Sequence, residues 1–332
     1  MLKLKEVFRI SRGARSEAPL VLTHIKFGGK EGIGEGSLPP LYGETWETAT
    51  AFMEEVDLSR FKDPFDTETI LSYVDSVAPG NQAAKTSIDI ALHDLIGKLL
   101  SIPVHAYFGL PAKRLSTSMT IGIGTAEEMA QKAKRYDSFK YLKIKLGTDN
   151  DKALIEAIRA VSNKPLFIDA NQAWSDKEKA LEFIQWLKEQ NVVFVEQPMP
   201  KASKKEQAWL TERSPLPIIG DEGVQRLADL REASSIYHGI NIKLMKSTGL
   251  REGYKMAVTA KALGMKLMFG CMSETSCAIS AAAQLGALAD WVDLDGNLDA
   301  DNDLYEGVQL ENGELVLNGR PGIGIKERES FK

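Results

Sequence analysis

The chain has 332 residues, of which 43% are hydrophobic and 26% are charged, and its net charge is −5. These proportions are ordinary for a soluble globular protein, and the mild negative charge argues against nucleic-acid binding, which needs basic patches to neutralise phosphates. No apolar run is long enough for a transmembrane helix, and the first residues lack the apolar core of a secretory signal. Because Cys271 and Cys277 are the only cysteines, we expect a cytoplasmic protein without a disulfide framework or membrane association.

The first third of the chain changes from strand-like to helical patterns. Alternating apolar residues over 1–36 predict three strands, KLKEVFRI, PLVLTHIKFG and EGIGEGS, with the polar segment SRGARSEA as a loop between the first two. From Thr45 to about Leu110 apolar residues recur at three- and four-residue spacing, which is typical of helices. Strands followed by helices indicate an α+β domain, which we place at residues 1–114. His93, in the longest helix, is expected to have a structural role, because no other reactive residue types cluster with it.

Eight short apolar segments, each followed by a polar or reactive residue, recur at intervals of about 25 residues between residues 117 and 296. Such a period fits one buried strand plus one covering helix, and eight repeats fit a closed parallel barrel with catalytic groups at the carboxyl ends of its strands. No long amphipathic helix follows the last segment, and residues 305–332 look like short strands. We therefore expect an α/β barrel over 115–304 and a tail that returns to the first domain. The residues that mark the strand ends are Thr120, Lys145, Asp169, Glu196, Asp221, Lys243, Cys271 and Asp295.

Three consecutive strand ends carry the carboxylates Asp169, Glu196 and Asp221, each embedded in an apolar run. A single acid at such a position could be an ordinary solvated charge, but three that point at one place repel one another unless a cation lies between them. Ligation by oxygen alone selects a hard ion, so the sequence predicts a Mg²⁺ site.

Lysines mark two further strand ends. Lys143 and Lys145 lie two apart in one strand and project to the same face, and Lys243 follows four strands later, on the opposite side of an eight-stranded barrel. A lone lysine there would be a surface residue whose charge reaches solvent. An opposed pair around a metal can instead remove an α-proton from one face of a carboxylate substrate and return a proton to the other, as a racemase or epimerase does. Lys246, just beyond the strand, is the alternative to Lys243.

These motifs together resemble the enolase superfamily, and within it the muconate-lactonising subgroup. The resemblance covers nearly the whole chain and is carried by K-x-K, D-A-N, E-Q-P, D-E and N-I-K at 143–145, 169–171, 196–198, 221–222 and 241–243. It implies a modified TIM barrel, (β/α)7β, with an N-terminal capping domain (1–114) completed by the C-terminal tail (305–332). The implied Mg²⁺ ligands are Asp169, Glu196 and Asp221, and the implied acid–base pair is Lys145 and Lys243.

Within that subgroup the chain is similar to the dipeptide epimerases of the L-Ala-D/L-Glu type, through N-I-K-L-M-K-S-T-G and the D-x-D of V-D-L-D-G. The similarity implies that Asp293 and Asp295 hold the terminal ammonium of the substrate, that Thr120 and Lys143 contact substrate, and that Cys271 lines the pocket. An ordinary solvated acidic stretch is the alternative for the two aspartates, because the segment around them is rich in acids. The segment K-S-T-G-L stands where many relatives have a glycine pair, which weakens the transfer of an exact substrate.

We therefore expect a Mg²⁺-dependent dipeptide epimerase, an isomerase that inverts the α-carbon of the C-terminal residue of a dipeptide by two-base 1,1-proton transfer through a metal-stabilised enediolate. Arg12 or Arg15, in the capping domain, could pair with the acidic side chain of an Ala-Glu-like peptide from peptidoglycan metabolism; two solvated surface charges are the alternative. The enzyme is expected to act on a small molecule and to be a homo-oligomer. The other possibilities are an o-succinylbenzoate synthase, N-acylamino acid racemase or cycloisomerase with the same site, or an inactive metal-binding scaffold.

Overall fold

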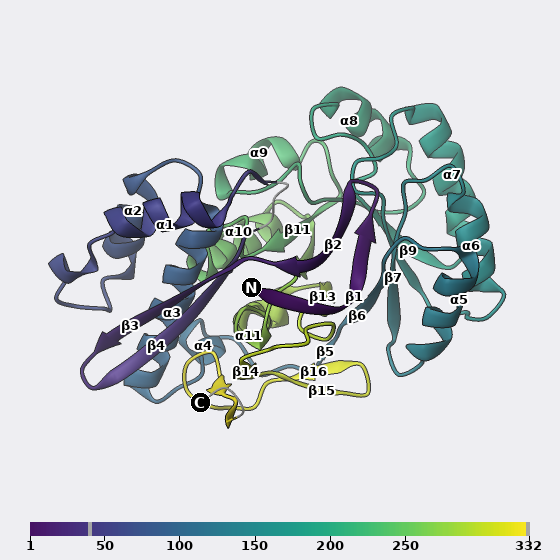
Figure 1. Cartoon of the computed structure of the whole chain (residues 1–332). Helices are drawn as coiled ribbons and strands as arrows, with labels where there is room; N and C mark the ends of the chain where they lie inside the picture. The colour runs from purple at the N-terminus through teal and green to yellow at the C-terminus, as the bar shows by residue number, and fades with distance from the viewer. Residues whose placement is uncertain (39–41, 330–332) are drawn as a thin grey trace.

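The structure is a computed structural model that describes residues 1–38 and 42–329. It consists of a parallel β-barrel surrounded by helices, an α+β region made by the N-terminal part of the chain, and a C-terminal segment of short strands (Figure 1). The expected modified TIM barrel with an N-terminal α+β domain is confirmed. The last residues of the tail that we expected to complete that domain, 330–332, lie outside the described residues.

Eight strands form the barrel, and each pairs in parallel with the next one along the chain. An isolated parallel bridge between Thr117, just before the first strand, and Val292, in the last strand, joins the two ends of this sheet. The strands are β6 (Ser118–Ile121), β7 (Tyr141–Lys145), β8 (Leu166–Asp169), β9 (Val192–Glu196), β10 (Ile218–Gly220), β11 (Gly239–Lys243), β12 (Lys266–Gly270) and β13 (Trp291–Asp293). Four strands end on the residues predicted to mark their ends, Lys145, Asp169, Glu196 and Lys243.

Helices alternate with these strands on the outside of the barrel. They are α5 (Ala126–Arg135), α6 (Asp151–Arg159), α7 (Lys177–Glu189), α8 (Lys204–Arg213), α9 (Leu230–Ala233), α10 (Leu250–Ala262) and α11 (Ser276–Leu285), with short 3-10 turns η3 (Leu227–Asp229) and η4 (Gly286–Leu288). In the described part of the chain no helix follows β13, as (β/α)7β requires. Every residue of α11 is buried, because this helix lies between the barrel and the N-terminal region. A helix buried on all sides has no polar face, so no amphipathic pattern marks it in the sequence.

The N-terminal region contains two hairpins and a layer of helices. Its elements are β1 (Leu2–Ile10), β2 (Gly13–Ala18), β3 (Leu20–Phe27), β4 (Lys30–Ser37), α1 (Trp46–Glu55), η2 (Leu58–Arg60), α2 (Thr67–Val77), α3 (Gln82–Leu100) and α4 (Val104–Tyr107). The prediction of a loop over SRGARSEA was wrong, because most of it forms β2, which pairs antiparallel with β1. Most side chains of this hairpin are exposed, so β2 has no buried face and lacks the apolar alternation by which strands are recognised.

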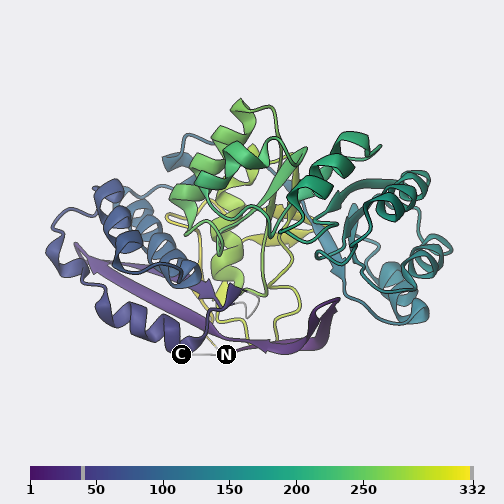
Figure 2. The ribbon, with the colours of Figure 1, turned by 90° about the horizontal axis from the view of Figure 1, so that it is seen from above.

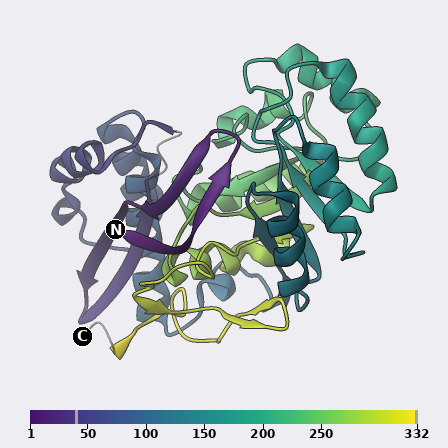
Figure 3. The same ribbon diagram turned by 45° about the vertical axis from the view of Figure 1, so that its right-hand side comes forward.

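The β1–β2 hairpin and the barrel lie side by side. In Figures 1 and 3 the hairpin crosses in front of the barrel strands, and Figure 2 shows it running from the α+β region along one side of the barrel. Backbone hydrogen bonds join it to the barrel at two places: Lys5 N–H donates to Asp299 O, and Ile123 N–H donates to Arg9 O. The hairpin therefore covers the rim of the barrel while its outer face stays in solvent.

The second hairpin, β3–β4, packs its β4 strand directly on helix α3. Gly32, Gly34 and Gly36 alternate along β4, and a Cβ atom on any of them would lie about 2 Å from a backbone carbonyl oxygen of α3. Glycine at these positions lets the strand and the helix approach backbone to backbone. The glycine-rich segment is therefore a packing surface, in agreement with the expected hairpin strand.

Helix α3 fixes this region to the barrel through buried polar groups. Asp89 accepts hydrogen bonds from the backbone N–H groups of Leu250 and Arg251 at the start of α10, where a carboxylate also meets the positive end of the helix dipole. Thr86 Oγ1 donates to Leu244 O in the turn after β11. His93 Nδ1 lies 2.8 Å from Asp89 O inside α3, which confirms the structural role expected for this histidine.

The C-terminal segment packs against the N-terminal region and the residues that connect it to the barrel. Strand β16 (Glu314–Val316) pairs antiparallel with β5 (Leu115–Ser116), and Gly322 forms an isolated bridge with Pro103 just before α4. The Ile323 N–H also donates to Asp94 Oδ1 of α3. The other short strands of this segment are β14 (Tyr305–Glu306), β15 (Gln309–Glu311) and β17 (Lys326–Glu327).

Candidate active site

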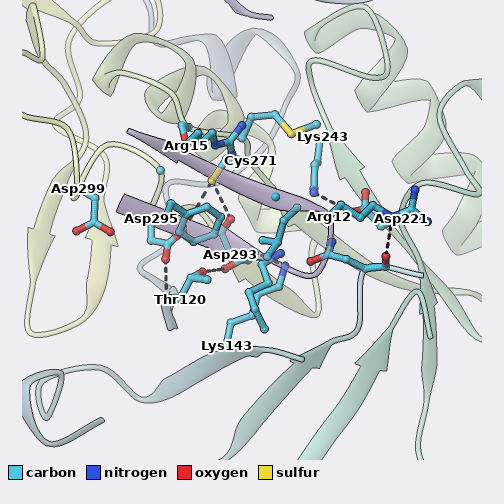
Figure 4. Close-up of a pocket in the computed structure, with 18 of the residues that line it drawn as sticks. Arg12, Arg15, Thr120, Lys143, Asp221, Lys243, Cys271, Asp293, Asp295 and Asp299 are labelled. Atoms are coloured by element: carbon cyan, nitrogen blue, oxygen red, sulfur yellow. Dashed lines mark hydrogen bonds and ion pairs between the residues drawn. The ribbon is translucent and has the colours of Figure 1, made fainter. Parts of the chain in front are cut away.

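A cavity of about 450 Å³ lies between the β1–β2 hairpin and the carboxyl ends of the barrel strands. Side chains from both parts point into it (Figure 4). All the predicted site residues line this cavity except Asp169 and Glu196, which are fully buried and touch the lysines that line it. The lining members are Arg12, Arg15, Thr120, Lys143, Lys145, Asp221, Lys243, Cys271, Asp293 and Asp295.

The three predicted metal ligands meet at one point. One carboxylate oxygen from each of Asp169, Glu196 and Asp221 lies within 4.8 Å of the others, and all three side chains are buried. Burial and the neighbouring Asp169 charge raise the pKa of Glu196 to about 7. Despite burial, Lys145 and Lys143 lower the pKa of Asp169 to about 2, and Lys243 and Lys246 hold the pKa of Asp221 well below its usual range. The cluster therefore depends on nearby positive charge.

Two further buried oxygens show that this cluster fits a hydrated divalent cation. Asn171 Oδ1 and Glu222 Oε2 have no hydrogen-bond donor among the described residues, and both side chains line the cavity. Unpaired buried acceptors are costly unless a water or an ion meets them. An all-oxygen set with acceptors for water around it matches the preference of Mg²⁺, which keeps several of its water ligands.

The predicted acid–base lysines stand on opposite sides of the triad. Lys145 Nζ lies 2.6 Å from Asp169 Oδ2, and Lys243 Nζ lies 2.7 Å from Asp221 Oδ2. Their strands, β7 and β11, are four apart in the eight-stranded order. Burial opposes the charge on Lys243, but the Asp221 and Glu196 carboxylates outweigh it and hold the pKa of Lys243 well above its ordinary value. Both amines end at the cavity, so a substrate placed between them would meet one on each face.

Lys143 lies deeper than Lys145 and connects two groups of acids. Its Nζ lies 2.7 Å from Glu196 Oε2, 3.1 Å from Asp169 Oδ2 and 2.7 Å from Asp293 Oδ2, and the residue is only 1% exposed. Although burial opposes it, these three carboxylates raise the pKa of Lys143 well above its ordinary value. Lys143 is therefore a fixed positive charge between the triad and the end of β13.

The two aspartates of V-D-L-D-G, expected to act as an equivalent pair, have different surroundings. Asp293 accepts a hydrogen bond from Ser118 Oγ (2.7 Å) and pairs with Lys143. Asp295 accepts one from the Thr120 backbone N–H (2.6 Å) and has no ion-pair partner within the described part of the chain. Burial and the nearby Asp293 charge raise the pKa of Asp295 to about 7. Of the two, Asp295 is the carboxylate that lacks a cation.

Cys271 lines the cavity between these acids and Arg15 (Figure 4). Its Sγ–H donates to Asp293 O at 3.3 Å. Burial, followed by the neighbouring Asp295 and Glu274 charges, raises the pKa of the thiol well above its ordinary value. The side chain is therefore a neutral, space-filling part of the wall.

The two predicted arginines of the hairpin also differ. Arg12 is exposed, and its Nε donates to Asn171 O at 3.1 Å. Arg15 is partly buried, with its guanidinium 5.6 Å from the centre of the Phe8 ring, and no carboxylate forms an ion pair with it among the residues described. Burial lowers the pKa of Arg15. Both point to the cavity, but of the two only Arg15 lacks a polar partner among the residues that the structure describes.

Several lining residues were not predicted. Tyr42, Phe8 and Met272 belong to the cavity wall, and Ser118 fixes Asp293. Tyr42 and Phe8 come from the N-terminal region, and no sequence spacing relates them to the barrel strands. Ser118 opens β6 at the period of the repeat, so its position could have been found from the strand pattern, although its contact with Asp293 could not.

The sequence matches known families over both regions. Residues 2–109 match the mandelate racemase/muconate lactonizing enzyme N-terminal domain, and residues 125–330 match the enolase C-terminal domain-like family. The L-Ala-D/L-Glu epimerase of Bacteroides thetaiotaomicron is 50% identical over 326 residues, which cover 98% of this chain and 85% of that protein.

Two solved structures add to this comparison. A dipeptide epimerase from Enterococcus faecalis, complexed with Mg and the dipeptide L-Leu-L-Tyr, has a TM-score of 0.92 at 32% identity, covering 98% of this chain and 96% of that one. An N-succinyl Arg/Lys racemase from Bacillus cereus has a TM-score of 0.93 at 28% identity, covering 99% and 93%. Proteins named for different substrates, a dipeptide and an N-succinyl amino acid, thus share this fold. Matches over both regions establish that the chain belongs to the mandelate racemase/muconate lactonizing enzyme family of the enolase superfamily.

Proposed function

We propose that the protein is a Mg²⁺-dependent dipeptide epimerase that inverts the α-carbon of the C-terminal residue of its substrate by two-base proton transfer. The observation that carries this proposal is the opposed pair Lys145 and Lys243, each within 2.7 Å of a carboxylate of the same triad. Two amines on opposite sides of one metal-binding carboxylate cluster are what inversion at a planar carbon requires. The similarity to named dipeptide epimerases supports the choice of substrate class.

Asp169, Glu196 and Asp221 would hold the ion. When bound, Mg²⁺ supplies positive charge that neutralises the triad and makes the α-proton of a substrate carboxylate more acidic. The carboxylate charge that keeps Lys243 protonated would also be offset by the ion. One amine, Lys145 Nζ or Lys243 Nζ, takes the proton from one face in its neutral form, and the opposite, protonated Nζ donates a proton to the other face. Lys143 stays between the acids as a fixed cation, because its three carboxylate contacts hold it there.

Asp295 selects the terminal ammonium of a dipeptide in this proposal. It is the carboxylate of the pair without a cation, and it faces the cavity beside Thr120. A free α-ammonium supplies the missing charge, whereas an N-acyl group does not and a second substrate carboxylate would be repelled. The unpaired Asp295 carboxylate therefore favours a dipeptide over the substrates of an N-acylamino acid racemase or an o-succinylbenzoate synthase.

Arg15 is the better candidate for recognising an acidic C-terminal side chain. Its guanidinium is largely removed from water and has an aromatic face on one side, so a substrate carboxylate would gain a strong, charge-assisted partner. Arg12 is already bonded to Asn171 O and remains in solvent. We therefore propose an Ala-Glu-like preference carried by Arg15, which agrees with the name of the Bacteroides relative.

Compartment and assembly are further parts of the proposal. Both cysteines are free thiols, which supports a reducing cytoplasmic setting, and no helix in the described ranges has the length and apolar character to span a bilayer. We propose a cytoplasmic homo-oligomer that acts on peptides of cell-wall origin. Light scattering of the purified protein, together with localisation of the tagged chain, tests these points.

A dipeptide library in deuterated water tests the proposed function. L,L-dipeptides are incubated with enzyme and Mg²⁺, and mass spectrometry measures deuterium at the C-terminal α-carbon, with N-acetyl dipeptides and N-succinyl amino acids as parallel substrates. Uptake with free dipeptides, Ala-Glu above others, and little with the acylated compounds is the expected result. Uptake that is equal or greater with acylated substrates would instead identify an N-acylamino acid racemase. No uptake from any compound would favour an inactive scaffold.

A further inference from the structure

Lys246 has the contacts of a residue that shapes the metal site without facing the substrate. It lies in the turn after β11, is 2% exposed and does not line the cavity. Its Nζ donates to Asp221 Oδ1 and Asp221 O, both at 2.6 Å, and to Val224 O and Asn241 O at 3.0 Å. Four acceptors surround one ammonium group, so the side chain has no freedom to reach a substrate.

These contacts continue the link between two barrel strands beyond the point where their backbone pairing stops. Strands β10 and β11 pair only at Ile219 with Gly239 and at Gly220 with Ile240. The carbonyl groups that come next on both strands, those of Asp221 and Asn241, are bonded to the Lys246 ammonium. Lys246 therefore joins the strand that positions Asp221 to the strand that positions Lys243.

The three carboxylates of the triad share one pattern, in which one oxygen is held from behind and the other faces a lysine of the cavity wall. Asp169 Oδ1 accepts from the Asn171 N–H (2.9 Å), and Glu196 Oε1 accepts from Asn241 Nδ2 (2.8 Å). Asp221 Oδ1 is held by Lys246. The second oxygens of the three residues contact Lys145, Lys143 and Lys243, respectively.

The local backbone explains why a lysine is needed at Asp221. At Asp169 the holding donor is the amide two residues further on, that of Asn171. The equivalent amide after Asp221, that of Gly223, donates instead to Gln197 Oε1 at 3.1 Å. The Asp221 carboxylate therefore has no local backbone donor, and Lys246 supplies one from the next strand.

We propose that Lys246 is a positioning residue, which fixes Asp221 as a metal ligand and keeps it in place when Lys243 turns from Asp221 toward the substrate. The proposal rests on the proposed function only for the identity of the ion. It excludes Lys246 as the alternative to Lys243 in the acid–base pair. That alternative arose because Lys246 lies just beyond the strand that ends at Lys243. Outer-shell groups of this kind contribute roughly 10- to 100-fold to metal affinity.

The test compares Lys246→Met with a matched control, Lys85→Met, using Mg²⁺ calorimetry without substrate. Lys85 is equally buried at 3% exposed, and its Nζ donates to Asp75 O, Asp75 Oδ1 and Ala78 O, but it belongs to α3. Both variants should lose thermal stability, and only Lys246→Met should bind Mg²⁺ more weakly, by roughly 10- to 100-fold. If Lys246→Met does not fold, Lys246→Gln replaces it, because its amide removes the charge and keeps two donors.

Affinity distinguishes positioning from other roles. Unchanged Mg²⁺ affinity would assign Lys246 to stability alone, and tighter binding would mean that its charge merely competes with the ion; either result overturns the proposal. Deuterium exchange supplies a second readout on a substrate and its epimer. A positioning residue should slow exchange from both stereoisomers to the same extent, whereas loss from only one would identify Lys246 as a base. The calorimetric result stands whether or not dipeptides are the substrates.

Discussion

The outer carboxylates of the metal triad, Asp169 and Asp221, occupy equivalent places on the barrel but are held by different means. Asp169 is held by a neutral backbone N–H, which the left-handed conformation of Asn171 (φ 45°) turns toward it. Asp221 is held by the buried ammonium of Lys246. A backbone amide needs a particular turn, and a buried lysine needs enough acceptors to offset its desolvation. Equivalent ligands in one site can therefore depend on backbone shape on one side and on charge on the other.

Removal of either carboxylate charge is expected to have the largest effect. Asp169→Asn and Asp221→Asn should each abolish Mg²⁺ binding and activity, and Glu196→Gln should do the same, because each removes one of three buried ligands. The two outer variants should differ in stability. Each outer variant leaves one lysine of the cavity wall without its carboxylate, Lys145 or Lys243. Asp221→Asn also leaves the deeply buried Lys246 without its carboxylate, and breaking such a buried pair costs about 3–5 kcal/mol.

Calorimetry with Mg²⁺ and urea denaturation of the metal-free variants measure both parts of this prediction. Full turnover by protein treated with EDTA would remove the metal from the mechanism. Equal loss of unfolding free energy in the two outer variants would remove the distinction between backbone and charge.

Replacing the proposed acid–base lysines tests whether the two sides of the site act on opposite faces of the substrate. Lys145→Ala and Lys243→Ala should each lower epimerisation by about 10²–10⁴-fold, the usual contribution of a general acid or base. Each variant retains the base for one face of the α-carbon. It should therefore keep α-proton exchange from one stereoisomer and lose it from the other, and the two variants should differ in which stereoisomer still exchanges. Deuterium uptake from each stereoisomer, followed by NMR, gives the assignment, and near wild-type epimerisation by either variant would contradict the two-base mechanism.

Asp295 extends the comparison to the side of the site that Lys143 connects to β13. Asp295→Asn should lower kcat/KM for a free dipeptide by roughly 10- to 100-fold, because one charge-assisted hydrogen bond to the ammonium is lost. It should not lower turnover of N-acetyl-Ala-Glu, so the gap between the two substrates should narrow. Asp293→Asn, in contrast, should weaken Mg²⁺ binding. It removes one carboxylate partner of Lys143, whose other partners are Asp169 and Glu196 of the triad. Similar kcat/KM values for both substrates in the wild type would refute the ammonium role.

Arg15 belongs to neither side of the triad, and its replacement should have the smallest effect. Arg15→Ala should lower the preference for Ala-Glu over Ala-Gln by about tenfold, in line with one hydrogen bond to a charged group, and should leave Mg²⁺ affinity unchanged. Arg12→Ala is the matched control and should change the preference little, because Arg12 Nε already bonds to Asn171 O. Competition assays with both peptides give the ratio directly, and an unchanged ratio in Arg15→Ala would assign side-chain recognition elsewhere.

Local periodicity was sufficient to predict the last residue of four of the eight barrel strands, and it placed the other four markers within two residues of a strand end. Asp169 and Glu196 are the last residues of β8 and β9, because a buried parallel strand is an apolar run whose first charge marks its exit. The same reasoning placed Lys145 and Lys243 four strands apart. Sequence reasoning failed where a contact joins distant segments. Nothing near Lys143 indicates that Asp293, 150 residues away, is its partner, so the two aspartates of V-D-L-D-G looked equivalent.

Prediction also failed where a strand has no buried face. The segment SRGARSEA was expected to be a loop, yet Gly13–Ala18 is β2, and it carries Arg15 to the cavity. Its pairing with β1 depends on backbone hydrogen bonds, which leave no pattern in side-chain polarity. For Lys246 the sequence allowed a role that the structure excludes. Its spacing from Lys243 was compatible with a side chain that faces the substrate, and only the acceptors around its Nζ show that it does not.

The bridge between Thr117 and Val292 joins the first and last strands of the barrel, and the contacts proposed for the amino end of a dipeptide lie across that seam. Ser118 bonds to Asp293 and Thr120 to Asp295, in each case over a sequence separation of 175 residues. Closing a loop of this length costs chain entropy, so we expect these contacts to form only after the ring has closed. We expect a chain still lacking β13 to hold both lysines and all three carboxylates and yet offer no place for a peptide ammonium. The ability to recognise the substrate would then be the last property acquired during folding. A bound dipeptide would also stabilise the contact between the first and last strands of the barrel.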